Sequence, residues 1–379
     1  MANNKKRRKK KKKSRKLLLF AFEVLFLGVL LVAAYFFQLM NRVDYKEMDE
    51  TEAGINDDLD KNTLETLEGY TNIAIFGLDN RQKNTYNNGN SDVVMIASIN
   101  NETKDVKLIS VYRDTYLSIG NGKYSKCNSA YANGGATQAV QMLNSNLDLD
   151  IKEYVSVDWA AVVEVIDALG GLDLEITQGE MNQINQYKKD VDKVTGLVTP
   201  NLTQYGRVHL DGTQATTYAR IRKLAGDDYK RASRQRIVMQ AILEKAKKAD
   251  IGTLTQICNT VVDHIQTSMS TSQILSMATS VTKYNITSTT GFPFDLTTKN
   301  LSSGDTVIPI DLANNVKQLH AYMFDGTDYV PSQTVQTISD TITTRTGVTS
   351  DSMKVDTSEY NETVGADGTD QLKKSINGN

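Results

Sequence analysis

Two aspartates and one arginine stand at the ends of three short apolar segments in the stretch 72–115. The segments are NIAIFGLDNR, SDVVMIASIN and VKLISVYRDT, whose Val and Ile content and bounding Gly, Asn or Asp are typical of β-strands. Short connections favour antiparallel neighbours, because a parallel crossover needs a dozen or more residues. Folding the second hairpin about the midpoint of 100–105 places Asp92 opposite Arg113, and folding the first about the midpoint of 80–91 places Asp79 opposite Asp92.

Such a group of side chains has a definite chemistry. Two neighbouring carboxylates repel each other unless a proton or a cation lies between them. A hard divalent cation, Mg²⁺ or Mn²⁺, completed by water and phosphate oxygens, suits Asp79 and Asp92. Arg113 beside them offers a fork of donors that matches a phosphate group. The alternative is that both aspartates are ordinary turn residues at strand ends, where Asp is frequent.

A second basic group lies in YARIRKLAGDDYKRASRQR, residues 218–236. Arg220 and Arg222, two positions apart, would point to opposite sides of a continuing helix. They can reach one ligand only if the helix that begins after Asp211 ends near them. Gly226 and the two aspartates that follow it supply the turn and the start of the next helix.

On that next helix, Arg231, Arg234 and Gln235 share one face of the first turns. A helix N-terminus favours anions, because its free N–H groups and dipole present positive charge. The same face continues as Val238 and Ile242, so it passes from polar residues into apolar packing. A solvated basic face is the alternative, and the acidic domain around this run favours an anion site.

Charge is distributed unevenly along the chain. Its 379 residues suffice for one large or two medium domains, and the net charge is −2. The first 42 residues hold 12 of the 43 Lys and Arg and a single acid, Glu23, so the rest of the chain carries a net charge of −13. This acidic balance, without a helix-turn-helix pattern, argues against nucleic acid as a partner.

The N-terminal region has the pattern of a membrane anchor. The basic segment 5–16 precedes LLLFAFEVLFLGVLLVAAYFF, whose 21 residues would extend about 31 Å as a helix, the thickness of a bilayer core. The positive-inside rule places 1–16 in the cytoplasm, against anionic lipid, and the chain after about 41 outside. A cleavable signal peptide is the alternative, although the apolar stretch exceeds a typical h-region. We expect an uncleaved anchor over 17–40.

The remaining elements follow from periodicity and composition. Residues 41–69 predict an acidic extracellular spacer or a marginal helix, and 178–208 a polar surface excursion near the site. Helices are expected after Gly134–Gly135 and near 251–265, 270–283 and 311–324, a strand near 286–292, and a strand–helix–strand unit over 154–176 that indicates an α/β fold. Residues 349–379 predict a disordered tail. Cys127 and Cys258 predict buried free thiols, with one disulfide as the alternative.

Six motifs follow one another in the order and spacing of the LytR-CpsA-Psr family. They are GLDNR (77–81), SDVVMIASIN (91–100), SVYRDTYLSIG (110–120), KCNSAYANGG (126–135), LDGTQATTYARIR (210–222) and DDYKRASRQR (227–236). The chain resembles this family over about 70–248. The resemblance implies an α/β fold, a mixed central β-sheet sandwiched by helices that enclose an apolar channel. It also implies a catalytic domain over 70–348, whose extension at 250–348 has no assigned role.

The resemblance also implies an activity. Members of the family are membrane-anchored phosphotransferases that move a glycopolymer, such as teichoic acid or capsule, from a polyprenyl-pyrophosphate carrier to a muramic acid hydroxyl of peptidoglycan. Motif match implies Asp79 and Asp92 as metal ligands and, with Arg113, as catalytic residues. It implies a pyrophosphate site made of Arg81, Arg113, Arg220, Arg222, Arg231 and Gln235. A polyprenyl-pyrophosphate phosphatase and a non-catalytic lipid-phosphate-binding regulator, of the transcription attenuator type, are the alternatives.

The chain departs from the family pattern at three places. Residues 89–91 are Gly-Asn-Ser where some members carry an arginine, Tyr112 stands where proline is common, and Leu117 replaces a second arginine. The positive charge expected at the pyrophosphate is reduced, which bears on affinity or polymer preference more than on the type of reaction.

Overall fold

The computed structural model describes residues 38, 42–78, 89–222, 227–326 and 328–360. The chain divides into two units, Met1–Val43 and Asp44–Asn379, and every element below belongs to the second. Within the described part of the chain, no helix combines the length and apolar character that crossing a bilayer requires. The anchor expected at 17–40 falls outside that part except for Gln38.

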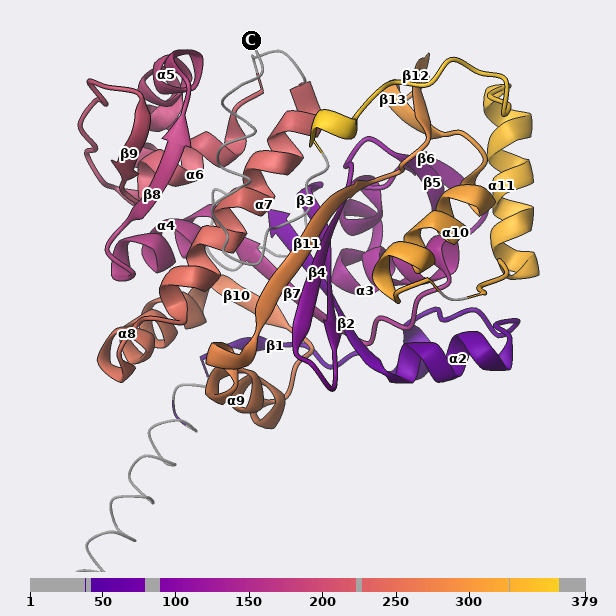
Figure 1. The fold of residues 1–379 in the computed structure, drawn as a ribbon, viewed down its shortest axis with the longest axis horizontal. Coiled ribbons are helices and arrows are strands. Elements are labelled where there is room, and N and C mark those ends of the chain that lie inside the picture. The colour runs from indigo at the N-terminus through magenta and orange to yellow at the C-terminus, as the bar shows by residue number, and fades with distance from the viewer. Residues whose placement is uncertain (1–37, 39–41, 79–88, 223–226, 327, 361–379) are drawn as a thin grey trace, which may run out of the picture. The chain divides into compact units, whose positions relative to one another are not determined.

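Seven strands form a mixed central sheet with the order β1-β10-β7-β2-β3-β4-β11 (Figure 1). The strands β2, β3 and β4 are antiparallel neighbours, as the short loops predict. In contrast, β7 runs parallel to β2 and β11 parallel to β4. The bounds are β1 (Asp44–Tyr45), β2 (Tyr70–Leu78), β3 (Ser91–Asn100), β4 (Asp105–Val111), β7 (Glu153–Asp158), β10 (Ile265–Thr267) and β11 (Asn285–Phe292).

Three two-stranded sheets lie outside the central one. They are β5 (Tyr116–Gly120) with β6 (Lys123–Lys126), β8 (Leu172–Ile176) with β9 (Gly206–Leu210), and β12 (Leu296–Leu301) with β13 (Gly304–Pro309). The strand–helix–strand unit expected over 154–176 is present as β7 (Glu153–Asp158), the helix Trp159–Ala168 and β8, but β8 lies outside the central sheet and pairs with β9. Gly171 permits this pairing: its φ is +78°, and a Cβ there would lie 2.7 Å from the Leu210 carbonyl.

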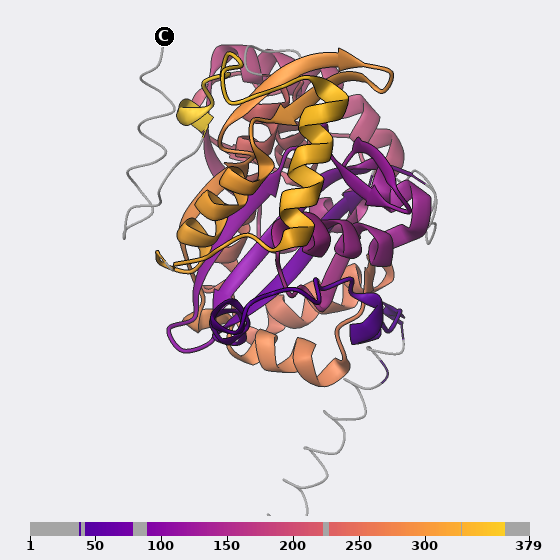
Figure 2. The same cartoon turned by 90° about the vertical axis from the view of Figure 1, so that its right-hand side faces the viewer.

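Helices cover both faces of the central sheet, which confirms the mixed α/β class (Figures 1 and 2). One face packs against α3, α10 and α11, and the other against α7 and α9. The helices are α2 (Lys61–Glu68), α3 (Ser129–Leu147), α4 (Trp159–Ala168), α5 (Gln178–Thr195), α6 (Gly212–Arg220), α7 (Asp227–Ala246), α8 (Ile251–Val261), α9 (Thr271–Thr279), α10 (Leu312–Met323) and α11 (Gln333–Thr346), with short 3-10 turns at Glu50–Glu52, Val262–His264, Val281–Lys283 and Ser358–Tyr360.

Several expected elements are present with other bounds. The helices α8, α9 and α10 and the strand β11 confirm the expectations for 251–324. Gly134–Gly135 has non-helical dihedrals and forms a kink in α3, and the expected helix follows it, while a short helical segment from Ser129 that was not expected precedes it. Both cysteines are free thiols, as predicted, although Cys258 is only half-buried.

Three segments expected to be largely irregular are wholly or partly ordered. Residues 178–195 form α5, whose start is a capping box in which Thr177 and Glu180 bond each other's backbone N–H. In the segment 41–69 the marginal helix is present as α2, and the chain from Asp44 onward packs into the domain, because β1 pairs with β10 and Leu67 is buried. Part of the expected disordered tail is also attached, since Val355 N donates to Leu296 O at 2.9 Å.

A buried polar cluster ties the C-terminal region to the end of α3. The carboxylate of Asp148 accepts from Asn56 Nδ2 at 2.6 Å, from the Tyr329 hydroxyl at 2.5 Å and from Ser332 N at 2.8 Å. His320 Nε2 lies 2.9 Å from Leu147 O and its ring stacks on Tyr329. A carbonyl can only accept, so Nε2 carries a proton and donates. Every polar member of the cluster therefore has a partner.

His320 predicts that the domain loses stability in mild acid. Its burial lowers its pKa to about 4, against the smaller opposing effects of Leu147 O and Asp148. The unfolded chain, with a pKa near 6.5, binds the proton that the folded state refuses, so stability is complete above that value and falls as pH falls toward 4. We expect the free energy of unfolding to drop by about 2 kcal/mol between pH 7.5 and pH 5 in urea titrations.

Two glutamine variants test this prediction, one at His320 and a control at His209. His320→Gln should flatten this pH dependence, whereas His209→Gln, on the exposed side of β9, should leave it unchanged. An equal slope in all three proteins would contradict the role of His320.

Candidate active site

The ion pair between Asp92 and Arg113 is the centre of the site. In the β3–β4 hairpin Met95 pairs with Ser110, and continuing this register places Asp92 opposite Arg113 as predicted. Asp92 Oδ1 accepts from Arg113 Nη1 at 2.6 Å, with both side chains mostly shielded from solvent. The expectation for this pair is confirmed.

The expected register of the first hairpin is wrong by one residue. Folding about the midpoint of 80–91 would pair Gly77 with Val94, whereas Gly77 pairs with Val93 and an irregularity follows before Leu78 pairs with Ser91. A Cβ at Gly77 would lie 2.7 Å from a Val93 methyl, so glycine permits this close crossing. Asp79 and Arg81, which the motif match assigns to the metal and the pyrophosphate, lie outside the described residues.

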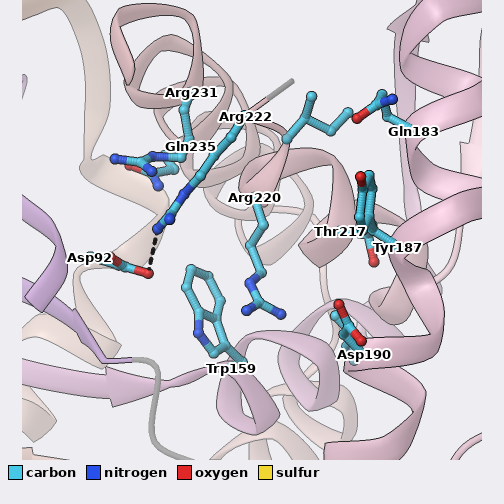
Figure 3. A pocket seen from close by; sticks show the side chains of 12 residues that line it. Asp92, Trp159, Gln183, Tyr187, Asp190, Thr217, Arg220, Arg222, Arg231 and Gln235 are labelled. Carbon is cyan, nitrogen blue, oxygen red and sulfur yellow. Dashed lines mark hydrogen bonds and ion pairs between the residues drawn. The ribbon is translucent and has the colours of Figure 1, made fainter. Parts of the chain in front are cut away.

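Arg220 and Arg222 reach the same site because α6 ends between them. Helix α6 starts with Asp211 as N-cap and stops at Arg220, and Ile221 is extended (φ −57°, ψ 127°). Arg222 Nη2 donates to Asp92 Oδ2 at 2.9 Å (Figure 3). The Arg220 guanidinium lies 4.9 Å from the centre of the Trp159 ring. Asp92 therefore accepts from a guanidinium group at each of its two oxygens.

Arg231 and Gln235 enter from the first turns of α7, one helical turn apart. Arg231 Nη2 donates to Asp228 Oδ1 at 2.6 Å, and its Nη1 has no hydrogen-bond partner among the described residues. Burial lowers the pKa of Arg231 to about 10, against the opposing effect of Asp228, so it stays charged at neutral pH. Arg234, on the same stretch, points elsewhere and pairs with Glu180 at 2.8 Å.

Behind this group lies a pair of aspartates, Asp114 and Asp228, that both face the Nε of Arg113. Burial raises the pKa of Asp228 and the contact with Asp114 raises it further. Burial opposes ionisation of Asp114 too, but Asp228, Lys126 and Arg113 outweigh it and hold its pKa below the usual value.

Arg113 lies among all three carboxylates. Its Nε is 3.3 Å from Asp114 and 3.7 Å from Asp228. Burial lowers the pKa of Arg113, but the charges of Asp228, Asp114 and Asp92 together raise it above its ordinary value. The guanidinium is thus permanently charged and held from three sides.

The site contains a cavity of about 200 Å³ (Figure 3). Among the expected residues, Asp92, both arginines of the α6 end, Arg231 and Gln235 line it, and Arg113 reaches it through Asp92. The sequence reasoning missed the other lining residues, which are Trp159, Gln183, Tyr187, Asp190, Val191, Thr217 and Ile221. Four of these lie on α5, and the Thr177-x-x-Glu180 signature of its capping box is the signal that could have found that helix.

The sequence reasoning also missed Asp228, which holds Arg231 in position. Its loss should weaken the binding of a lipid donor that carries a pyrophosphate. It holds Arg231 from a place outside the cavity lining. We expect Asp228→Asn to raise the KM for a pyrophosphate donor by about 10- to 100-fold, since outer partners of binding groups contribute on that scale. Asp228→Glu, which keeps the charge, should restore part of the loss. A KM that is equal in all three proteins would contradict this role.

Comparisons with known proteins agree with these motifs. The sequence model of the LytR_cpsA_psr family matches residues 35–320. A polyisoprenyl-teichoic acid–peptidoglycan teichoic acid transferase TagU from Enterococcus faecalis is 30% identical over 250 residues, 65% of this chain and 76% of that protein. A TagU from Bacillus mycoides is 28% identical over 260 residues, 66% of this chain and 79% of that protein.

Solved structures share the fold. TagT bound to LI-WTA superimposes with a TM-score of 0.51 over 80% of this chain and 94% of that chain, at 21% identity. At that identity the likeness concerns the fold alone. The family model spans most of the chain, and all six motifs lie within the residues that it matches. This protein therefore belongs to the LytR-CpsA-Psr family.

Proposed function

We propose that this protein is a phosphotransferase that attaches a teichoic acid or related glycopolymer, carried on polyprenyl pyrophosphate, to peptidoglycan. The proposal rests on one observation, the cavity that Arg220, Arg222, Arg231 and Gln235 line together. Relatives named teichoic acid transferases support the substrate class. So does a protein of the same fold described as bound to LI-WTA.

The reaction is a substitution at phosphorus. A hydroxyl of the acceptor sugar forms a bond to the phosphorus that bears the polymer, the bond from that phosphorus to the bridging oxygen breaks, and polyprenyl phosphate leaves. The hydroxyl proton passes to a carboxylate, for which Asp92 and Asp79 are the candidates. Guanidinium groups already in place offset the charge on the transferring group and on the leaving phosphate.

Asp92 binds the guanidinium groups to which a phosphate of the substrate would bind. Its two oxygens bind Arg113 and Arg222, so it acts as an internal anion in the free protein. A phosphate matches the same forked donors and carries more charge, so it competes with the carboxylate for them. Donor binding would release Asp92 for its own tasks, which are to hold a cation and to accept the hydroxyl proton.

A divalent cation, Mg²⁺ or Mn²⁺, is part of the proposal. The described residues contain no cluster of three or more Asp, Glu, His or Cys that could hold a metal by itself. The hard oxygens of Asp92 suit a cation whose other ligands are water and phosphate oxygens. Asp92 and Asp79 would hold it, and when bound it supplies positive charge at the phosphate oxygens.

An apolar face continues from the cavity along α7. Met239 and Leu243 follow Gln235 at intervals of one turn and are half-buried against the central sheet. The expected apolar packing of Val238 and Ile242 is present too, in a second cluster with residues of α5 and α6. Helix α9 adds Ile274 and Met277 to this face without burying a single residue completely. Incompletely packed apolar side chains next to the arginines suit the hydrocarbon chain of the carrier.

This placement makes an effect of lipid length testable. Leu243→Trp should raise the KM for a donor with a long polyprenyl chain about tenfold, because the larger ring takes up space two turns beyond Gln235. A ten-carbon donor should be unaffected, since its chain is too short to meet the ring. The control is Leu275→Trp, at an exposed position of α9. An equal effect on both donors would contradict the proposed path.

The same proposal includes the membrane topology. Residues 1–16 would lie in the cytoplasm, 17–40 would span the membrane, and the domain would lie outside the cell, where peptidoglycan is. Residues 70–348 form the catalytic domain in this scheme, extended at its start by 44–69.

The test is transfer by the full-length protein in lipid nanodiscs, given lipid-linked polymer, peptidoglycan and Mg²⁺. Polymer coupled to peptidoglycan is the expected product. Free polymer without coupling would identify a phosphatase, and donor binding without either product would identify a regulator.

A further inference from the structure

A second cavity lies at the hairpins beyond the arginine site. It measures about 290 Å³ and is formed by the β5–β6 hairpin, the β12–β13 turn and the end of α11. Figures 1 and 2 show these elements side by side. Its lining, here named the Tyr124 groove, is Tyr116, Tyr124, Ser125, Leu301, Ser302, Ser303 and Arg345. None of these residues lines the arginine cavity.

Side chains of the Tyr124 groove combine aromatic faces with a cation. The rings of Tyr116 and Tyr124 lie 6.1 Å apart, and the Arg345 guanidinium lies 4.4 Å from the centre of the Tyr124 ring. Arg345 is exposed, and in the part of the chain that the structure describes no carboxylate pairs with it. Its forked donors are therefore open to a carboxylate or a phosphate.

Such a lining suits a sugar that carries a negative charge. The flat apolar side of a pyranose ring packs against tyrosine, and its hydroxyls suit the serine hydroxyls of the β6 and β12–β13 segments. A carboxylate or phosphate on the sugar would meet Arg345. Lys299, which donates to Thr346 O at 2.5 Å, adds positive charge beside Arg345 and keeps the end of α11 in place.

The groove is attached directly to the site. Val307 N donates to Asp114 O at 2.9 Å, and Lys126 pairs with the Asp114 carboxylate at 2.9 Å. Tyr116, which pairs with Lys126 across the β5–β6 hairpin, follows Asp114 by two residues, a span of at most about 7 Å along the chain. A sugar in the groove would thus lie on the same hairpin that carries Lys126, the partner of Asp114.

We propose that the Tyr124 groove binds an anionic sugar residue of the glycan on which the protein acts, an inference that rests on the proposed function. The shared chemistry is a pyranose with a carboxylate or phosphate. It is supplied either by a peptide-free muramic acid of the acceptor, whose lactyl carboxylate is free, or by a sugar phosphate in the polymer of the donor. The first source predicts a subsite for the acceptor, and the second a subsite for the outgoing polymer.

The test measures binding to the full-length protein in nanodiscs by saturation-transfer NMR and calorimetry. The probes are a peptide-free N-acetylglucosaminyl-N-acetylmuramic acid oligomer, a soluble teichoic acid whose repeating unit is a sugar pyranose phosphate, and neutral chitotetraose. One of the two anionic probes should bind, and chitotetraose should bind more weakly. Arg345→Ala and Tyr124→Ala should each weaken that binding about tenfold. The controls Arg207→Ala and Tyr205→Ala, at exposed positions of the 197–210 region, should not.

The outcomes separate this proposal from the proposed function. Farnesyl pyrophosphate binding, which depends on the arginine cavity, should be the same in Arg345→Ala as in the wild type. If neither anionic probe binds in a manner sensitive to Arg345, the groove proposal is overturned even when transfer is observed. If sensitive binding is found but no transfer occurs, the groove stands and the transferase proposal fails.

Discussion

Replacing Arg113 by Ala should lower the rate of glycopolymer transfer about 100- to 1,000-fold, the usual cost of one preorganised donor to a developing charge. Arg113 presents a forked cation to the site and donates to Asp92 at 2.6 Å. It also lies within ion-pair distance of Asp114 and Asp228. The variant loses a charge-assisted donor and leaves three neighbouring acids without their common cation.

Two further variants separate charge from geometry. Arg113→Lys keeps the charge without the planar fork, so we expect an intermediate rate. Arg207→Ala removes an exposed arginine of β9 and should leave transfer unchanged. Melting temperatures of all variants show whether the domain is folded. A folded Arg113→Ala protein with full activity would remove Arg113 from the mechanism.

Replacing Asp92 by Ala should have opposite effects on binding and on transfer. The change frees Arg113 and Arg222 from their carboxylate, so farnesyl pyrophosphate should bind about tenfold more tightly in the absence of divalent cations. Transfer should fall at least about 100-fold, because the cation ligand or proton acceptor is lost. Calorimetry gives the first quantity and the reconstituted assay the second.

Asp190 supplies the matched control, since it is the other aspartate of the cavity lining. In Asp190→Ala the binding of farnesyl pyrophosphate without metal should change less than in Asp92→Ala. Asp92→Asn should resemble Asp92→Ala in transfer, because an amide neither accepts the proton nor holds the cation as well as a carboxylate. Weaker metal-free binding in Asp92→Ala would contradict the competition between Asp92 and phosphate.

Local patterns were sufficient for the strands that hold Asp92 and Arg113. The alternation of Val and Ile, together with a loop of a few residues, defines a hairpin whose register can be extended to its end, and the ion pair follows. The same symmetry failed for the β2–β3 hairpin, because the strands do not pair about the midpoint of 80–91 and an irregularity after Gly77 shifts the register once more. Sequence periodicity contains no sign of such a local slip.

Helix ends were predictable where a polar side chain marks them. Asp211 caps α6, and the arginines two positions apart required its end at Arg220. In α5 the same kind of signal was present at Thr177 and Glu180, but the polar composition of the segment masked it. Helix α5 contributes side chains to the cavity because it packs against α6.

The sequence by itself determined the family, the central hairpins and the set of cationic residues, since motifs, periodicity and spacing are local properties of the chain. Only the tertiary structure decided that Asp92 bridges Arg113 and Arg222, that Asp228 joins Asp114 beside Arg113, and that α5 and Trp159 complete the cavity. The Tyr124 groove likewise joins residues 116–125 to residues 301–345. Packing brings these distant segments together, and it depends on the summed burial of many side chains rather than on any local pattern.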